Sequence, residues 1–320
     1  MKRIDGEAVP PSSNTGGKFP ARSFNPVHVD AVAFSFIDEA FNEFDLPAFS
    51  CMLERFFTGF RATPRVGGAM GFGCSAEVNI GGLVAWGNGR TGGNQRGRVF
   101  VSLMGMASAC CKDWRAFAQW IDDQPERLGF RIARVDLAYD DLDAKHYSVE
   151  QSVTDYGLGA FNAGGTPPSH QYITSGKFGE RQAQTFYIGK SENGRMFRIY
   201  EKGQQLQDCV HPNWVRVEMQ LTAKDRVIPT DTLRRPDIYL AGSCPALAFI
   251  AQEHQRIKTC RIVAEKTLDA MTKWAQRQTG KVVHALLKFH NGDVQQVLSR
   301  ITVHELPRRL LFWDHLPTGA

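Results

Sequence analysis

Several stretches of the chain alternate apolar and polar residues with a period of two, the pattern of a strand with one buried face. The alternation is clearest in Phe130–Asp141, where Val135 and Leu137 are flanked by polar residues. Asn193-Gly194 is a strong turn signal between two further stretches, so we expect a hairpin there. The predicted strands are His28–Phe36, Ala76–Ile80, Leu83–Trp86, Val99–Leu103, Phe130–Asp141, Thr185–Lys190, Met196–Lys202 and Trp214–Leu221.

Apolar residues recur at helical spacing in other parts of the chain. Glu39–Phe60 has this spacing, although Pro47 must break or restart the helix. Lys112–Asp123 has it too, with Pro125 just beyond the end, and the pattern is helical from Asp231 onwards. No internal repeat is visible. The predicted fold class is α+β: a mostly antiparallel sheet with helices on one face, an open polar face and a helical C-terminal extension.

The chain divides into three predicted regions. Residues 1–25 are rich in Pro, Ser and Gly and are expected to form a flexible N-terminal arm. Residues 26–230 hold every predicted strand and should form one α+β domain. Residues 231–320 should form a helical, basic C-terminal region. The predicted helix Glu39–Phe60 and the strands around it belong to the middle region.

Basic residues are concentrated near the C-terminus. Between Pro245 and Phe312 there are eleven Lys and Arg against five Asp and Glu, whereas the whole chain carries a net charge of only +5. With Trp274 and Phe289 among them, these helices could hold duplex DNA through its phosphates, although an ordinary solvated face is the alternative. The basic residues are Arg256, Lys258, Arg261, Lys266, Lys273, Arg277 and Lys281.

Composition excludes several classes of protein. No run of about 18 apolar residues is present to span a membrane, and the N-terminus does not resemble a signal peptide, so we expect a cytoplasmic protein. Seven cysteines without a C-x-x-C pair argue against a disulfide framework or a zinc site. The run Gly87–Asn94 superficially suggests a nucleotide-binding turn, but a β-turn is favoured because no strand-then-helix context accompanies it.

Three predicted strands each carry polar side chains on one face, since alternate residues of a strand point to opposite sides. A half-solvated sheet is the simplest explanation of such faces. Short Asp is nevertheless depleted in strands, so two Asp on one strand favour a metal and phosphate site. The side chains in question are Arg134, Asp136 and Asp140; Arg198, Tyr200 and Lys202; and Arg216, Glu218 and Gln220.

These residue types suit phosphoryl transfer. A hard cation such as Mg²⁺ prefers carboxylate oxygens and can polarise a phosphate. A tyrosine hydroxyl becomes a nucleophile when cations lower its pKa or a base takes its proton. Arg198 and Lys202 flank Tyr200 at two residues on either side, so a phosphate clamp and a charge-stabilising lysine could lie beside that hydroxyl.

Three ordered sequence blocks resemble the trans-acting replication initiators, namely the Rep proteins of rolling-circle plasmids and the replication initiation factors of filamentous phages. The spacing also fits, with thirteen residues from Tyr187 to Tyr200. The resemblance covers roughly residues 130–230. The blocks are Arg134-Val135-Asp136-Leu137-Ala138-Tyr139-Asp140, then Tyr187-Ile188-Gly189-Lys190-Ser191 with Arg198-Ile199-Tyr200-Glu201-Lys202, and Trp214-Val215-Arg216-Val217-Glu218.

The resemblance implies roles for individual residues. Tyr200 would be the nicking tyrosine, with Arg198 and Lys202 assisting it, and the partner-strand Tyr187 would instead pack or stack on a base. Asp136 and Glu218 would be ligands of Mg²⁺ or Mn²⁺. Asp30, which resembles the Asp that opens the fold in this family, and Asp140, which lies on the same strand face as Asp136, compete for the remaining place. Gln220 stands where many members of the family have a second Glu, so the family's ligand at that position is not carried over.

The implied activity is metal-dependent nicking and rejoining of single-stranded origin DNA through a 5′-phosphotyrosine, on an open catalytic face like that of the His-hydrophobe-His nickases but without the paired histidines. The implied partners are origin DNA, single-stranded at the nick and duplex nearby, and a host helicase and polymerase; a homodimer is also considered. A bacterial host cell is the expected location, without membrane association. A conjugative relaxase and a non-catalytic DNA-binding regulator are the alternatives.

Overall fold

The computed structural model describes residues 27–87, 97–162, 166–175, 183–224, 226–251 and 264–303. It divides into two compact units, Met1–Thr259 and Cys260–Ala320. The predicted N-terminal arm, nearly all of the Gly87–Asn94 turn, and Arg256, Lys258 and Arg261 lie outside the described residues. None of the described helices is long and apolar enough to cross a membrane.

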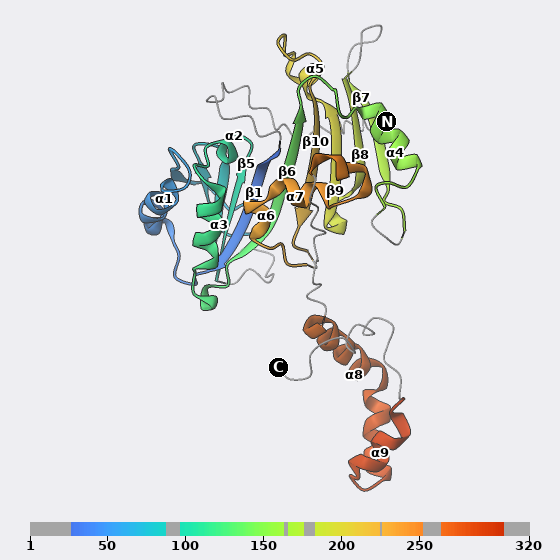
Figure 1. The fold of residues 1–320 in the computed structure, drawn as a ribbon. Helices are drawn as coiled ribbons and strands as arrows, with labels where there is room; N and C mark the ends of the chain where they lie inside the picture. Colours follow the sequence, from blue (N-terminus) through green and yellow to red (C-terminus); the bar gives the residue numbers. More distant parts are fainter. Residues whose placement is uncertain are drawn as a thin grey trace, which may run out of the picture. The chain divides into compact units, whose positions relative to one another are not determined.

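The first unit is built on a ten-stranded sheet in which all paired neighbours run antiparallel (Figure 1). The strand order is β2-β3-β4-β5-β1-β6-β10-β9-β8-β7. The strands are β1 (Val27–Ile37), β2 (Ala62–Arg65), β3 (Cys74–Val78), β4 (Gly82–Trp86), β5 (Arg98–Met104), β6 (Arg131–Asp141), β7 (His170–Ser175), β8 (Ala183–Lys190), β9 (Arg195–Glu201) and β10 (Val215–Thr222).

The helices connect and flank these strands. In the first unit they are α1 (Leu46–Glu54), α2 (Met106–Ala109), α3 (Trp114–Asp122), α4 (Val149–Gly157), α5 (Lys202–Leu206), α6 (Asp231–Arg234) and α7 (Pro236–Ala241). The short 3₁₀ helices are η1 (Glu43–Asp45), η2 (Glu126–Leu128), η3 (Ser191–Asn193) and η4 (Pro245–Ile250). The second unit contains α8 (Ala264–Phe289) and α9 (Val294–Ile301).

The hydrophobic core lies between the helices and one face of the sheet. Val135 and Leu137 of β6 are fully buried in the same cluster as Phe49 of α1, Phe117 of α3 and Leu240 of α7. Burying side chains of this size contributes roughly 1.5–3 kcal/mol each, which fixes the face on which the helices sit. The predicted α+β class, with an antiparallel sheet and helices, is confirmed.

Local signals explain where the helices begin. Asp113 accepts a hydrogen bond from the backbone N–H of Arg115 (2.8 Å), which caps the start of α3 as expected for an N-cap aspartate. Pro47 occupies the first turn of α1, where its missing N–H costs nothing. The predicted helix over Glu39–Phe60 is therefore limited to its middle part, since the proline begins α1 instead of interrupting it.

The structure contains elements that the alternation of residue types does not predict. β2 and β7 are the two edge strands, and their side chains are mostly exposed, so they lack the apolar face on which the prediction depends. β2 includes Pro64, which a strand tolerates at a sheet edge. α6 and α7 follow residue 230, the predicted domain boundary, yet α7 packs against β1 and β6 and buries Leu240, so the compact unit extends beyond that residue.

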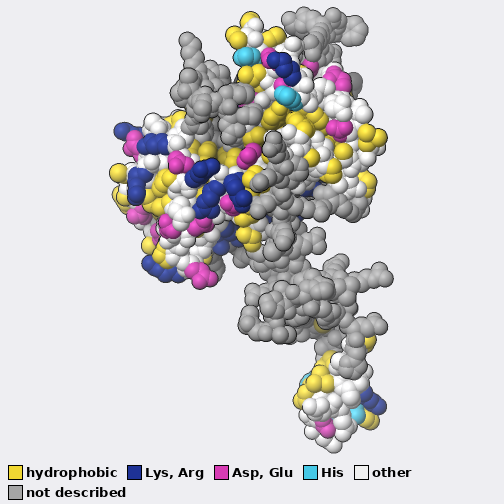
Figure 2. Space-filling view, in the orientation of Figure 1, with side chains coloured by type: hydrophobic (Ala, Val, Ile, Leu, Met, Phe, Trp, Pro, Cys, Tyr) yellow, Lys and Arg dark blue, Asp and Glu magenta, His cyan; other side chains and the backbone are white. Residues whose placement is uncertain are grey.

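Figure 2 looks onto the helix-covered side in the orientation of Figure 1, where basic and acidic side chains are interspersed with apolar ones. The polar residues singled out in the sequence lie on the other face of the sheet, because their strand neighbours fill the core. In the second unit, Asp293 caps α9 by accepting a hydrogen bond from the Gln296 N–H (3.1 Å).

Candidate active site

The register of four strands brings the sequence-predicted site residues onto one face, apart from Lys202, which follows β9 as the first residue of α5. Asp140 of β6 lies opposite Arg216 of β10, which lies opposite Tyr200 of β9. In the adjacent row of this face, Glu218 lies opposite Arg198. The strands therefore place these side chains on one polar face, as the period-two pattern predicts, although most of them are buried.

Tyr200 and Glu218 form a direct hydrogen-bonded pair on this face. The phenol donates a hydrogen bond to Glu218 Oε1 (2.6 Å), and Tyr200 is only 4% exposed. Burial and the neighbouring Glu218 charge raise the pKa of Tyr200 well above its usual value. The phenol is therefore held in its neutral form beside a carboxylate that can accept its proton.

Arg198 holds the other oxygen of the same carboxylate. Its Nε donates to Glu218 Oε2 (3.0 Å), its Nη2 reaches the same oxygen, and its guanidinium lies 5.0 Å from the centre of the Tyr200 ring. Although burial opposes a charge there, Glu218 raises the pKa of Arg198, so the guanidinium stays protonated. Arg198, Tyr200 and Glu218 thus form one hydrogen-bonded group.

Arg216 occupies the centre of the face and joins two acids from different strands. It donates from Nε and Nη2 to the two oxygens of Asp140 (both 2.6 Å), and from Nη1 to Asp30 of β1 (2.9 Å). Trp214 adds a third hydrogen bond to Asp140 (2.7 Å). Since both Asp140 oxygens are occupied, Asp140 is placed to position Arg216.

Lys202 stands at the first position of α5, just past the end of β9, and is 8% exposed. Its Nζ lies 5.3 Å from the centre of the Trp214 ring. Burial and the charge of Arg216 lower the pKa of Lys202 to about 8, against the opposing effect of Asp30 and Asp140. Lys202 is therefore a cation whose charge depends on pH within a physiological range.

Asp136 lies beside two other acids. Arg134, on the same strand, donates to Asp136 from Nε (2.8 Å) and from Nη2. Burial raises the pKa of Asp136 to about 6, and the charges of Glu218 and Asp30 add to the rise against the effect of Arg134. The carboxyl of Asp136 on β6 is thus near enough to Glu218 of β10 and Asp30 of β1 for their charges to disfavour its ionised form.

The carboxylates of Asp30, Asp136 and Glu218 are the groups on this face that could hold a divalent cation. The donor atoms of Asp30, Asp136 and Glu218 are the carboxylate oxygens that Mg²⁺ and Mn²⁺ prefer, and a cation among them would remove their mutual repulsion. The same acids are engaged by Arg216, Arg134 and Arg198. No group of three His, Cys, Asp or Glu side chains within the described ranges already has the arrangement of a metal site. The residue types fit, and binding requires Arg134, Arg198 and Arg216 each to release an oxygen of Asp136, Glu218 and Asp30.

Three further residues belong to this surface. The His28 ring lies 3.8 Å from one oxygen of each of Asp30 and Asp140, through Nε2 and Nδ1 respectively. Trp214 and Arg216 are the other two, and both donate hydrogen bonds to Asp140. Trp214 and Arg216 belong to the Trp-x-Arg-x-Glu block, so the sequence predicts that they lie near the site. It does not predict that they hold the carboxylate of Asp140. Tyr187 lies opposite Arg198 on the polar face, half-buried, whereas its neighbour Phe186 fills the core.

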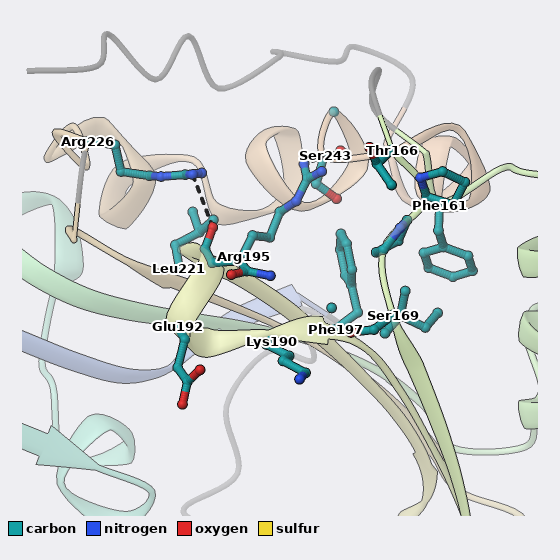
Figure 3. A pocket seen from close by; sticks show the side chains of 16 residues that line it. Phe161, Thr166, Ser169, Lys190, Glu192, Arg195, Phe197, Leu221, Arg226 and Ser243 are labelled. Atoms are coloured by element: carbon teal, nitrogen blue, oxygen red, sulfur yellow. Dashed lines mark hydrogen bonds between the residues drawn. The ribbon is translucent and has the colours of Figure 1, made fainter. Parts of the chain in front are cut away.

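A cavity of about 740 Å³ lies away from these residues, at the turn between β8 and β9 (Figure 3). None of the predicted catalytic or metal-site residues lines it. Arg195 reaches into this region and donates a hydrogen bond to the Ser243 carbonyl (2.8 Å), and Arg226 donates to the Asn193 carbonyl (3.3 Å). The cavity is thus bordered by the connection after α7 and is separate from the polar face.

Comparison with known proteins places the chain in context. A family model described as "Replication initiation factor" matches residues 130–302. Among solved structures, the chain is similar to a rolling circle replication initiator protein from Geobacillus stearothermophilus, with a TM-score of 0.50 and 16% sequence identity over 68% of this chain and 81% of that chain. At this identity the likeness is one of fold. No curated protein matches the sequence.

Proposed function

The chain belongs to the replication initiation factor family, and from this premise we propose that it initiates rolling-circle replication by nicking single-stranded origin DNA with Tyr200. The observation that carries the proposal is the hydrogen bond from the Tyr200 hydroxyl to Glu218 (2.6 Å) on the polar face. A nucleophile hydrogen-bonded to a general base, with cations beside it, is the arrangement that covalent phosphoryl transfer requires.

In the proposed reaction, the Tyr200 oxygen attacks the phosphorus of a phosphodiester while its proton passes to Glu218. The bond from phosphorus to the 3′ oxygen breaks, which leaves a 5′-phosphotyrosine on the protein and a 3′-OH on the DNA. Lys202, the cation of this face with a lowered pKa, supplies the proton that the leaving oxygen takes up. The reverse sequence rejoins the strand.

The arginines of the face have different proposed roles. Arg198 is placed to bind a non-bridging phosphate oxygen, since its guanidinium lies over the Tyr200 ring and is partly exposed. Arg216 is almost fully buried and holds Asp30 and Asp140, so it positions other groups and does not reach the DNA. Truncating Arg216 should therefore damage the architecture of the face.

A metal ion belongs to the same proposal. Asp30, Asp136 and Glu218 would hold Mg²⁺ or Mn²⁺ after their arginine partners release an oxygen, whereas Asp140 carries three hydrogen bonds from Arg216 and Trp214 and is assigned the positioning of Arg216. The bound cation would act as a Lewis acid toward the scissile phosphate. Origin DNA is the proposed substrate; the host helicase, the host polymerase and a homodimer stay predictions from the resemblance.

A supercoiled plasmid carrying the cognate origin tests the function. The protein should convert it to the open circular form in the presence of Mn²⁺ or Mg²⁺, and Tyr200→Phe should not. Tyr187→Phe is the matched control, because it removes a hydroxyl from the same face (opposite Arg198) without touching Glu218. Nicking by Tyr200→Phe at the wild-type rate would overturn the assignment of the nucleophile. Absence of nicking by the wild-type protein as well as by both variants would point to a non-catalytic DNA-binding protein.

A further inference from the structure

The ten-stranded sheet consists of two halves with the same topology. In each half the first strand is followed by a helix and then by four strands that return to pair with the first, so β1 pairs with β5 as β6 pairs with β10. The helix is α1 in one half and α4 in the other. The strand order therefore reads the same from either edge of the sheet toward the central β1–β6 pair.

The register of the central pair supports this symmetry. Ala33 of β1 lies opposite Arg134, and His28 of β1 lies opposite Ala138. If the pair Ala31–Asp136 is taken as the centre, a half-turn exchanges the two strands and brings Ala33 to the position of Ala138. Outward from the centre, Ser102 lies opposite Ala33 as Glu218 lies opposite Ala138.

Continuing the register outward matches the catalytic half to the other half residue by residue. At the equivalent positions the N-terminal half has no tyrosine nucleophile, no carboxylate and no arginine, so these positions do not form a second nicking site. The counterparts are Ser102 for Glu218, Leu83 for Arg198, Ala85 for Tyr200, Phe100 for Arg216 and Ser35 for Asp140.

Ser35, the counterpart of Asp140, lies between two arginines. Arg98 donates from Nη1 to Ser35 Oγ (3.3 Å), and Arg131 donates from Nε to the same oxygen (3.2 Å). In the catalytic half, Arg134, Arg198 and Arg216 each bind a carboxylate. Neither Arg98 nor Arg131 forms an ion pair with any carboxylate of the described residues.

Two guanidiniums held side by side without an acid repel each other. Burial and the charge of Arg131 lower the pKa of Arg98, and an anion between the two would remove the repulsion. Arg131 is exposed and Arg98 half-buried, so both are open to a ligand from the polar face. Phe100 stands two residues from Arg98 on the same face, and its ring stacks on Phe72 with centroids 6.1 Å apart.

We propose that Arg98, Arg131 and Ser35 form a phosphate-binding site for single-stranded DNA that continues across the sheet from the nicking site, with Phe100 as a base-stacking surface. Arginine on a backbone phosphate beside an aromatic platform is how proteins hold single strands without reading sequence. Tyr200 lies in the row of Asp140, whereas Ser35 lies opposite Arg131 at the other end of β6. The two sites are therefore separated by three strand spacings, roughly 14 Å, and by about 30 Å along the strands, so an extended strand of several nucleotides must connect them. The inference rests on the proposed function, because the strand must pass Tyr200.

Binding of fluorescein-labelled origin oligonucleotides, measured by anisotropy in the Tyr200→Phe background, tests the site. The oligonucleotides are lengthened one flank at a time from the nick position. Affinity should rise when one flank reaches the arginine pair, and Arg98→Gln/Arg131→Gln should lose that rise, binding the long oligonucleotide about tenfold more weakly. Each lost phosphate contact should also reduce the salt dependence of log K by about 0.7.

Controls separate this site from general effects of charge and folding. Arg55→Gln/Arg115→Gln removes two exposed arginines near α1 and on α3, and it should bind every oligonucleotide as the parent does. Arg98→Lys/Arg131→Lys keeps both charges and should recover most of the affinity, which would exclude misfolding as the cause. Equal affinity and equal salt dependence of the Gln variant and the parent would overturn the inference.

The outcome is independent of the proposed chemistry. Covalent adduct formation by the wild-type protein is measured in parallel on the same oligonucleotides. If the wild-type protein forms the adduct but the arginine pair has no effect on binding, the proposed function stands and the second site fails. If no adduct forms, the proposed function fails, and the length series still shows whether the arginine pair binds single strands.

Discussion

Glu218 accepts the Tyr200 hydroxyl hydrogen over 2.6 Å while Arg198 binds its other oxygen. The carboxylate is thereby fixed in orientation, with one oxygen directed at the nucleophile and one at a cation. This relationship joins β9 and β10, which are separated in the sequence by α5 and a loop, and it explains why a buried tyrosine can serve as a nucleophile. The base is already in place when the phosphate arrives.

Replacing Glu218 with Gln should slow the nicking step by about 10²- to 10⁴-fold, because the amide cannot take the phenol proton. Single-turnover nicking of a labelled origin oligonucleotide measures the effect. Glu192→Gln, an exposed residue of η3, is the matched control and should nick at the wild-type rate. A Glu218→Gln rate within threefold of wild type would remove Glu218 from the role of base.

Arg216→Met should destabilise the fold by about 3–5 kcal/mol, because Asp30 and Asp140 would be left as buried carboxylates without their partner. Urea unfolding followed by circular dichroism measures the free energy. Arg235→Met removes an arginine from a more exposed pair with Asp231, which should cost no more than about 1 kcal/mol. Similar losses for both variants would show that the central arginine does not organise the face.

Nicking should decline as the pH rises through about 8, where Lys202 loses its proton. Lys202→Arg should remove this decline, because a guanidinium stays charged far above that range, but it should nick more slowly at every pH, because a guanidinium is a poor proton donor to the leaving oxygen. The decline is measured as the rate of adduct formation at a series of pH values from about 6.5 to about 9.5. A wild-type profile that is flat through this range would exclude a role for the Lys202 charge.

The same lysine affects stability with a definite sign. The pKa of Lys202 is lower in the folded protein than in the unfolded chain, so the folded state binds fewer protons above about pH 8. The cost of burying the ammonium is therefore fully present below pH 8 and is lost as the pH rises toward the unfolded pKa. Between about pH 8 and the unfolded pKa of lysine, the free energy of unfolding of the wild-type protein should therefore increase relative to that of Lys202→Met, as measured by urea unfolding at each pH.

Removal of divalent cations with EDTA should abolish nicking, and added Mn²⁺ should raise the Tm of the wild-type protein. Asp136→Asn should lose the Tm response, because one of the three crowded carboxylates is gone. Asp143→Asn, at an exposed aspartate outside the polar face, should retain it. A Tm response of Asp136→Asn equal to wild type would exclude Asp136 as a ligand.

The sequence predicts the polar face well, because a period-two pattern converts directly into a sheet face. Arg198, Tyr200 and Glu218 meet for that reason, and the pairing register adds only which residues lie opposite one another. The period-two pattern does not predict which side chains on neighbouring strands hydrogen-bond to each other. Asp140 shows this: it lies on the predicted face, yet Arg216 and Trp214 occupy both of its oxygens.

The symmetry of the sheet is absent from the sequence for a physical reason. Equivalent strands share only the requirement for an apolar side, which many residues satisfy, while the functional positions differ completely, as Ala85 and Tyr200 illustrate. Edge strands such as β7 carry no buried face and give no alternation at all. Topology therefore reveals a repeat, and with it the Arg98 and Arg131 pair, that residue identities conceal.

The most direct test of the central claim is the identity of the residue that carries the DNA. The wild-type protein is incubated with an origin oligonucleotide and a divalent cation, the covalent adduct is isolated and digested, and the nucleotide-bearing peptide is sequenced by mass spectrometry. We predict a 5′-phosphoryl linkage on Tyr200. A linkage on Tyr187 or on any other residue would contradict the account of the nucleophile given by the Tyr200–Glu218 hydrogen bond.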